Sequence, residues 1–272
     1  MNALITASIA SLYAGPRPGT LEDEALCGVS AQVLEREEGW RRIRTSYRYE
    51  GWVRQEELTE DPALLRRWEE APKLLVWQSC ADILEEARVQ GRCLATLVRG
   101  CLVEPLDQGP DEKGWRRVRL PDGRQGFTPG KFLLPPVPVG GVPEDEEAFR
   151  ENVTKTALAY LGVQYRWGGR SPWGIDCSGL CFTAYYLNGV SIYRDAKILE
   201  GFPVHAIPAE QAKKGDLLFF PGHVAMYLGD GRFVHSTSHV GTHGVAVNSL
   251  TPGDPLFRPD LLETMTGAGS IF

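Results

Sequence analysis

An internal repeat in the first half of the chain restricts its fold more than any other feature of the sequence. Gly39-Trp-Arg-Arg-Ile-Arg44 recurs 75 residues later as Gly114-Trp-Arg-Arg-Val-Arg119. In both copies a second glycine follows the first by 12 residues and a leucine follows it by 19 residues. These later anchor positions are Gly51, Leu58, Gly126 and Leu133. Three matching anchor points at one offset argue against chance, and the period is that of a small domain rather than a solenoid unit.

Each copy of the repeat carries the signals of short β-strands. Residues 40–44 and 115–119 contain the aromatic and β-branched residues that are typical of strands. Pro121-Asp-Gly123 predicts a turn, because proline presets φ, aspartate bonds to the local backbone and glycine supplies a positive φ. Several strands in so short a length predict a small β-barrel for each copy. Residues 1–14 are interpreted as a first β-strand.

Two breaks divide the chain. Residues 60–73 predict a short linking helix, with Asp61 or Thr59 near its start, between repeat copies at residues 1–59 and 74–134. A linker is expected at 135–143, because the ten residues 134–143 hold four prolines and two glycines. Residues 144–272 are expected to form the C-terminal domain.

The C-terminal domain is predicted to contain helices followed by an antiparallel sheet, which is the α+β class. A helix of about 15 residues is expected from the recurrence of Phe149, Val153, Ala157, Tyr160 and Leu161. A second helix is expected from Cys177 to about Leu187. Strands are expected over 215–220, 223–228, 232–236 and 244–248, with Gly229-Asp-Gly231 as a hairpin turn.

Cys177 stands out among the six cysteines because of its setting. Gly174-Ile-Asp-Cys-Ser-Gly179 leads from a glycine-rich loop into a predicted helix, where backbone N–H groups and the helix dipole favour a thiolate. The other five are interpreted as small buried apolar residues: Cys27, Cys80, Cys93, Cys101 and Cys181. Cys177 is therefore the candidate nucleophile.

A base for this thiol is expected on the predicted hairpin. Pairing about the turn gives residue-number sums near 460, with Leu228 opposite Arg232 and Tyr227 opposite Phe233. His223 and His235 then become neighbours on adjacent strands. The remaining histidines, His205, His239 and His243, are interpreted as exposed loop residues. The rival hypothesis is zinc bound by Cys177, His223 and His235, but no H-E-x-x-H pattern occurs, so no metal or other cofactor is expected.

Charge and hydropathy exclude several classes of partner. The chain of 272 residues has a net charge of −6, which argues against nucleic acid and anionic membrane surfaces. No apolar run approaches the ~20 residues that span a bilayer. The N-terminus lacks Lys or Arg before Arg17, and Thr6, Ser8 and Ser11 interrupt its apolar stretch. A cytoplasmic location is expected, with secretion as the alternative.

The repeat resembles the bacterial SH3 (SH3b) domain, and the C-terminal domain resembles the NlpC/P60 cysteine peptidases. The first resemblance covers about residues 2–59 and 74–134. The second, over about 144–262, rests on five motifs in order. They are Tyr165-x-Trp-Gly-Gly169, Asp176-Cys-Ser-Gly-Leu180, Gly215-Asp-Leu-Leu-Phe-Phe220, His223-Val-Ala-Met-Tyr-Leu-Gly229 and Phe233-Val-His-Ser236. The resemblance implies a papain-like α+β domain preceded by two SH3-like barrels.

The same resemblance implies roles for individual residues. It makes Cys177 the nucleophile, His223 the base, His235 the orienting third residue and Tyr165 a donor to the oxyanion. Substrate contacts are implied at the following positions: Trp167, Asp176, Ser178, Arg194 and Asp195. In relatives that require a free N-terminal L-Ala, the aspartate of the Arg-Asp pair holds the α-ammonium. A tyrosine of the first SH3b domain also covers the site in those relatives; Tyr49 fits that position, and Tyr47 is the other candidate.

The implied activity is that of a γ-D-glutamyl-L-diamino acid endopeptidase, which cuts murein stem peptides between D-Glu and the diamino acid. Free peptides with an unblocked L-Ala, in cell-wall recycling, are the expected substrates. The alternatives are a secreted hydrolase of intact peptidoglycan and a wall-binding module with an inactive peptidase fold. The SH3b copies either bind peptide or wall, or only orient the next domain. The accepted diamino acid and the oligomeric state stay open.

Overall fold

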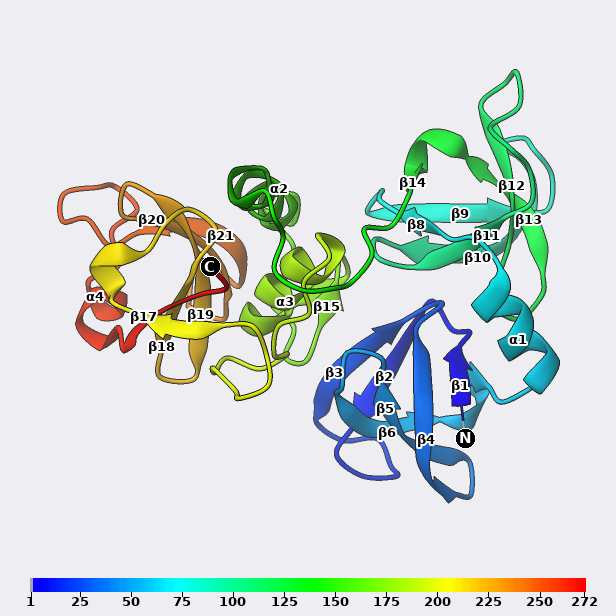
Figure 1. Ribbon diagram of the computed structural model, residues 1–272, viewed down its shortest axis with the longest axis horizontal. Coiled ribbons are helices and arrows are strands. Elements are labelled where there is room, and N and C mark those ends of the chain that lie inside the picture. The colour runs from blue at the N-terminus through cyan, green and yellow to red at the C-terminus, as the bar shows by residue number, and fades with distance from the viewer. Residues whose placement is uncertain (1) are drawn as a thin grey trace. The chain divides into compact units, whose positions relative to one another are not determined.

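The computed structural model describes residues 2–272, which form two compact units (Figure 1). The first ends at Pro136 and the second begins at Val137, and each is described by itself. Within residues 2–272, no helix has the length and apolar character needed to cross a membrane.

The first unit contains two seven-stranded antiparallel sheets with corresponding strand orders. The first sheet runs β3-β2-β6-β5-β4-β1-β7, and the second runs β10-β9-β13-β12-β11-β8-β14. The first set of strands is β1 Asn2–Ile5, β2 Ile9–Tyr13, β3 Leu21–Leu26, β4 Ser30–Glu37, β5 Trp40–Thr45, β6 Glu50–Arg54 and β7 Leu58–Thr59. The second set is β8 Leu74–Val76, β9 Cys80–Leu84, β10 Cys93–Val98, β11 Leu102–Pro105, β12 Trp115–Arg119, β13 Gln125–Pro129 and β14 Leu133–Leu134.

The glycines of the repeat are needed for the same structural reasons in both sheets. Gly39 and Gly114 precede β5 and β12 with φ of 73° and 83°, a region that favours glycine. Gly51 lies so close to β2 that a Cβ would approach the Cβ of Leu12 to 2.8 Å. At Gly126 an added Cβ would meet the Leu84 carbonyl oxygen of β9 at 2.6 Å. The repeated glycines are therefore required by turns and by close strand contacts.

Helix α1 (Pro62–Glu70) connects the two sheets, as predicted. Asp61 is its N-cap, with the carboxylate accepting the backbone N–H of Ala63 at 2.8 Å. The indole N–H of Trp68 donates to the carbonyl of Gly28, in the turn between β3 and β4, at 3.1 Å. Arg67 Nη2 donates to the carbonyl of Leu120, just after β12, at 3.3 Å. Short 3-10 turns, η1 (Gln55–Glu57) and η2 (Gly130–Phe132), precede β7 and β14.

Two predictions about this unit were wrong. Residues 1–14 were expected to form one strand, but β1 and β2 are separate and a bend intervenes at residues 7–8. Cys80 and Cys93 were interpreted as buried, yet both are exposed at the starts of β9 and β10. Alternating burial along β9 places Cys80 on the solvent side of that strand, whereas Cys93 begins a stretch of β10 whose first four residues are exposed or half-buried.

The second unit packs helices against a six-stranded antiparallel sheet of order β17-β22-β18-β19-β20-β21. Helix α2 packs beside α3, and α3 packs against β19 and β20 (Figure 1). The helices are α2 Glu146–Leu158, α3 Cys177–Leu187 and α4 Pro259–Thr264. The strands are β17 His205–Ile207, β18 Leu217–Phe220, β19 His223–Gly229, β20 Arg232–Thr237, β21 Gly244–Ser249 and β22 Gly267–Ser270. A small hairpin, β15 Arg170–Ser171 with β16 Gly174–Ile175, precedes α3, and a 3-10 turn, η3 (Ala209–Gln211), follows β17.

The predicted helices and hairpin of this unit are present, with differences in detail. Leu161 is 50% exposed and lies after α2, so it is not part of the buried helix face. In the hairpin, Tyr227 pairs with Phe233 as expected, but Arg232 pairs with Gly229 because a bulge displaces Leu228. His205 lies in strand β17 rather than in a loop, although it is exposed. Strand β22 and helix α4 were not predicted.

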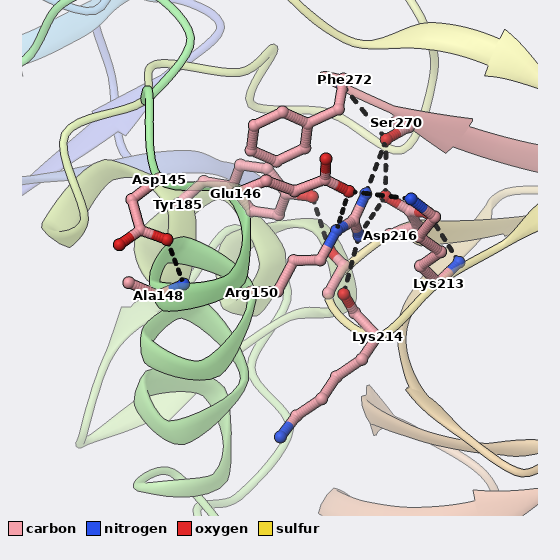
Figure 2. Close-up of polar contacts among 11 residues, drawn as sticks. Asp145, Glu146, Ala148, Arg150, Tyr185, Lys213, Lys214, Asp216, Ser270 and Phe272 are labelled. Carbon is pink, nitrogen blue, oxygen red and sulfur yellow. Dashed lines mark hydrogen bonds and ion pairs between the residues drawn. The ribbon is translucent and has the colours of Figure 1, made fainter.

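A buried ion pair ties α2 to the sheet (Figure 2). Nη1 of Arg150 donates to Oδ1 of Asp216 at 2.8 Å, and the Ser270 hydroxyl of β22 donates to the same oxygen at 2.7 Å. Oδ2 of Asp216 accepts the backbone N–H of Lys213 at 2.7 Å. Asp216 is 1% exposed and out of reach of solvent, and these bonds give both of its oxygens a partner within the protein.

Asp216→Ala is expected to lower the free energy of unfolding of this unit by about 3–5 kcal/mol, because it leaves the Arg150 charge buried without its main partner. Glu151→Gln, which breaks the exposed ion pair with Lys214, is the matched control and should cost less than about 1 kcal/mol. Urea unfolding measures both. Equal losses for the two variants would contradict the structural role of the buried pair.

Candidate active site

Helix α3 begins at the candidate nucleophile. Asp176 is the N-cap, and its Oδ1 accepts the backbone N–H of Gly179 at 2.5 Å. The other carboxylate oxygen accepts the N–H of Gly168, in the preceding loop, at 2.8 Å. Asp176 therefore fastens the glycine-rich loop to the first turn of the helix, and Cys177 is the first helical residue.

A buried arginine completes this arrangement. Arg194 is 2% exposed, and its Nη1 donates to Oδ1 of Asp176 at 3.0 Å and to the Ser178 hydroxyl at 2.9 Å. Its Nη2 donates to the carbonyl of Gly169 at 3.2 Å. Asp176, Ser178 and Arg194 thus hold the loop, the helix start and each other in place. The substrate contacts predicted for these three residues stay predictions.

The structure brings together the two histidines that the strand pairing indicated as neighbours. Nε2 of His223 lies 2.8 Å from Nδ1 of His235, and Nε2 of His235 lies 2.9 Å from Oδ1 of Asn248. His235 is fully buried, and His223 is partly exposed at the start of β19. Three polar side chains from three adjacent strands therefore form one hydrogen-bonded row.

Asn248 is the residue of this row that sequence reasoning missed. It belongs to β21, where Ala246 pairs with His235 and Asn248 pairs with Phe233. The two-residue period of strands puts Asn248 on the same face as His235. Extending the pairing argument from the predicted hairpin to the following strand would have found this side chain.

The Cys177 sulfur lies beside the start of β19, because it accepts the backbone N–H groups of Val224 and Ser178. Burial, and then the negative charge of Asp176, raise the pKa of the Cys177 thiol to about 11, although both N–H groups and Arg194 act in the opposite direction. Burial and the charge of Asp176 therefore oppose the stabilisation of a thiolate that the helix end was expected to give, and that expectation stays a prediction.

Burial also keeps both imidazoles neutral. It lowers the pKa of His223 to about 4, with a further lowering from Arg258. It lowers the pKa of His235 to about 3, followed by the effects of His223 and Arg258, and the hydrogen bond to Asn248 opposes this change. The ring of Phe220 packs 5.7 Å from that of His223, and the ring of Phe233 packs 5.0 Å from that of His235. These apolar surroundings favour the uncharged forms.

The loop before α3 supplies two aromatic side chains with different exposure. Burial, followed by the nearby Cys177 and Asp176, raises the pKa of Tyr165 to about 12, so its hydroxyl keeps its proton. A protonated hydroxyl near the sulfur can donate a hydrogen bond to a developing oxyanion. Trp167 is 62% exposed, and this leaves its indole available to an approaching ligand.

A narrow crevice of about 10 Å³ lies next to Cys181 and Val224. Its polar groups come from Ser178, Tyr193, Asp195 and Lys197, and its other walls are mostly apolar. Burial, followed by the charge of Asp195 and a hydrogen bond from the Tyr193 hydroxyl to that carboxylate, raises the pKa of Tyr193 to about 12. Asp195 therefore lines a narrow crevice in the same unit as Cys177.

The two tyrosine candidates of the first unit differ in their surroundings. Tyr47 is 3% exposed, and its hydroxyl donates to Oδ2 of Asp23 at 2.6 Å. Tyr49 is partly exposed, and its hydroxyl donates to the carbonyl of Glu22 at 3.4 Å. Tyr47 is a core residue of the first sheet, so Tyr49 keeps the assignment as a prediction.

The two remaining histidines of this region are not part of the row. His239 and His243 lie in the exposed loop between β20 and β21, as expected, and Nδ1 of His239 is 3.5 Å from Nη2 of Arg258. Among residues 2–272, no three His, Cys, Asp or Glu side chains are grouped so that they could hold a metal ion.

Comparisons with known families identify both kinds of domain. The NlpC/P60 family model matches residues 162–255, and the bacterial SH3 domain model matches residues 7–60. The SH3 match covers the first copy of the repeat, and the second copy lies outside it.

Relatives extend this likeness to the whole chain. The chain is 44% identical to Dipeptidyl-peptidase 6 of Lysinibacillus sphaericus, over 100% of both sequences. It is 29% identical to Gamma-D-glutamyl-L-lysine dipeptidyl-peptidase of Bacillus cereus, over 79% of this chain and 67% of that one. The crystal structure of an NlpC/P60 family protein from Bacillus cereus matches with a TM-score of 0.78 over 98% of both chains, at 24% identity. This last likeness concerns the fold.

The neutral histidine pair predicts a loss of stability in acid. In a Cys177→Ala background, the free energy of unfolding should fall as the pH drops from about 6.5 towards about 4. In this range the histidines of the unfolded chain become protonated, whereas the buried imidazoles of the folded chain stay neutral. The slope is up to about 1.4 kcal/mol per pH unit for each proton. Replacing His235 by Gln should reduce this slope, whereas His205→Gln, at an exposed site, should not. Urea unfolding at a series of pH values measures this slope. An unchanged slope in the His235 variant would contradict the conclusion that His235 is buried in its neutral form.

Proposed function

The chain belongs to the NlpC/P60 family and is a peptidase, and we propose that it hydrolyses the γ-D-Glu–diamino acid bond of murein stem peptides through Cys177. The observation that carries the proposal is the hydrogen-bonded pair of His223 and His235 beside a cysteine at a helix N-terminus. A relative named for γ-D-glutamyl-L-lysine dipeptidyl-peptidase activity supports the choice of substrate.

Attack by a neutral thiol requires a base, and His223 is the proposed base. As the sulfur bonds to the γ-carbonyl carbon of D-Glu, the thiol proton passes to Nδ1 of His223. The hydrogen bond from His223 Nε2 to His235 stabilises the imidazolium that forms. The imidazolium then gives its proton to the departing amine of the diamino acid, and a thioester to Cys177 remains.

The second half-reaction uses the same groups in reverse. His223 takes a proton from water, the resulting oxygen nucleophile attacks the thioester carbon, and the proton is returned to the sulfur. In both tetrahedral intermediates the oxyanion would receive hydrogen bonds from the backbone N–H of Cys177 and the hydroxyl of Tyr165. The raised pKa of Tyr165 supports this role, because a hydroxyl must keep its proton to donate.

The amino end of the substrate is proposed to bind in the crevice lined by Ser178 and Asp195. The Asp195 carboxylate would pair with the α-ammonium of L-Ala, and this selects peptides with a free N-terminus. Trp167, Asp176 and Arg194 would border or shape this subsite. Tyr49 is proposed as a further contact from the first unit.

Free peptides as substrates would place the enzyme in cell-wall recycling in the cytoplasm, and this location is part of the proposal. The corresponding strand order of the two sheets in the first unit supports a second SH3-like domain at residues 74–134.

Cys177→Ala is expected to reduce cleavage of L-Ala-γ-D-Glu-diamino acid by at least about 10⁴-fold, because no other group in the site replaces the nucleophile. Cys101→Ala, at a buried cysteine of the first unit, is the matched control and should keep near-normal turnover. Mass spectrometry of the products measures both. Normal turnover by the Cys177 variant would refute the assignment.

Acetylation of the L-Ala nitrogen should lower kcat/KM by about 10–100-fold, because it removes the charge that pairs with Asp195. Asp195→Asn should lower kcat/KM for the free peptide by a similar factor and leave the acetylated peptide unaffected. Glu200→Gln, at an exposed position five residues away, is the control. Equal rates for free and acetylated peptides in the unmodified enzyme would exclude this role of Asp195.

A further inference from the structure

We propose that Asn248 is a positioning residue that fixes the tautomers of His235 and His223 and thereby leaves Nδ1 of His223 as the basic nitrogen of the site. The consequence for catalysis rests on the proposed function. The tautomers themselves follow from the hydrogen bonds.

The amide of Asn248 can be oriented in only one way. Its Nδ2 lies 3.1 Å from the carbonyl oxygen of Leu256, which accepts hydrogen bonds but cannot donate them. The NH₂ group must therefore face Leu256, and the amide oxygen Oδ1 must face His235 at 2.9 Å. The loop that contains Leu256 is itself held to β21, because the backbone N–H of Ser249 donates to the same carbonyl at 2.9 Å.

An acceptor opposite Nε2 determines the tautomer of His235. Oδ1 of Asn248 cannot donate, so Nε2 of His235 carries the hydrogen. A neutral imidazole has one N–H group, so Nδ1 of His235 presents a lone pair. Burial keeps this ring neutral, and the apolar ring of Phe233 packs against it.

The same reasoning passes to the next ring. Nδ1 of His235 is an acceptor, so Nε2 of His223, 2.8 Å away, must be the donor. In the neutral form of His223 the lone pair then lies on Nδ1. Val224, the next residue, bonds through its N–H to the sulfur of Cys177. One fixed backbone carbonyl thus sets the direction of every hydrogen bond from Leu256 to the proposed base.

Several charged groups face this row and shift the pKa values of its histidines. Arg258 lowers the pKa of both imidazoles, Asp260 raises that of His235, and Asp176 raises that of His223. None of these three residues makes a hydrogen bond to either ring, so they shift the pKa of a ring without choosing between its two nitrogens. Asn248 is the group whose hydrogen bond makes that choice.

The direct test is the ¹⁵N spectrum of the ring nitrogens in the intact chain labelled at histidine. At neutral pH both His223 and His235 should show a protonated Nε2 and an unprotonated Nδ1. This measurement needs no substrate, so it stays informative even if the proposed substrate is wrong. A protonated Nδ1 on His235 would overturn the inference.

Variants separate the acceptor from the rest of the side chain. Asn248→Leu should populate both tautomers of His235 and lower kcat by about tenfold or more with little change in KM, because the ring loses its single acceptor. Asn248→Asp keeps an acceptor oxygen, so it should retain the Nε2–H tautomer and recover most of kcat. Its added charge should also move the acid limb of the pH–rate profile to higher pH, because it favours protonated His235.

Asn188→Ala is the matched control. Asn188 also makes two side-chain hydrogen bonds in this unit, to Thr156 and to the carbonyl of Ala184, but it lies at the end of α3 away from the histidines. It should change stability and leave kcat and the ring spectra unchanged. Unaltered histidine tautomers and unaltered kcat in Asn248→Leu would reject the inference, whereas failure of every variant and of the unmodified enzyme to cleave the peptide would reject the proposed substrate instead.

Discussion

The carboxylate of Asp176 is the interaction on which the site depends. It caps α3, receives an N–H from the preceding loop and pairs with the buried guanidinium of Arg194. A charge in so buried a position requires this number of donors, because an unsatisfied buried carboxylate is costly. The position of Cys177 follows, since it is the first residue beyond this cap.

The same carboxylate also affects the acidity of the thiol. Burial of the sulfur, followed by the charge of Asp176, raises the pKa of Cys177, and the proposed mechanism accordingly removes the thiol proton during attack. In the proposed mechanism His223 accepts this proton, and its low pKa keeps it neutral and able to do so. Its proposed orienting partners, His235 and Asn248, are uncharged and add no negative charge to the site.

Much of this arrangement could be predicted from local sequence signals. The repeat predicted paired strands in both copies. Its glycines, among them Gly39 and Gly51, recur because each copy needs them for a turn or for a close contact between strands. The hairpin turn predicted that His223 and His235 lie next to each other on adjacent strands, because the turn determines the register of the two strands. The start of α3 was also correct to the residue.

What could not be predicted depends on contacts between distant segments. Strand β22, Gly267–Ser270, has no hydrophobic alternation, and its Gly269 is needed because a Cβ would meet Val204 at 2.8 Å. The raised pKa of Cys177 results from burial that only the packed domain creates. Asn248 was missed because its strand pairing lies one strand beyond the hairpin, and its orientation depends on Leu256 in a later loop.

The most direct measurement of the central claim is mass spectrometry of enzyme quenched in acid during turnover of L-Ala-γ-D-Glu-diamino acid. Acid preserves a thioester, so the proposed mechanism predicts an added L-Ala-γ-D-Glu acyl group on the peptide that contains Cys177. Product formation without this adduct under conditions in which the acyl-enzyme should accumulate, or an adduct on another residue, would contradict it.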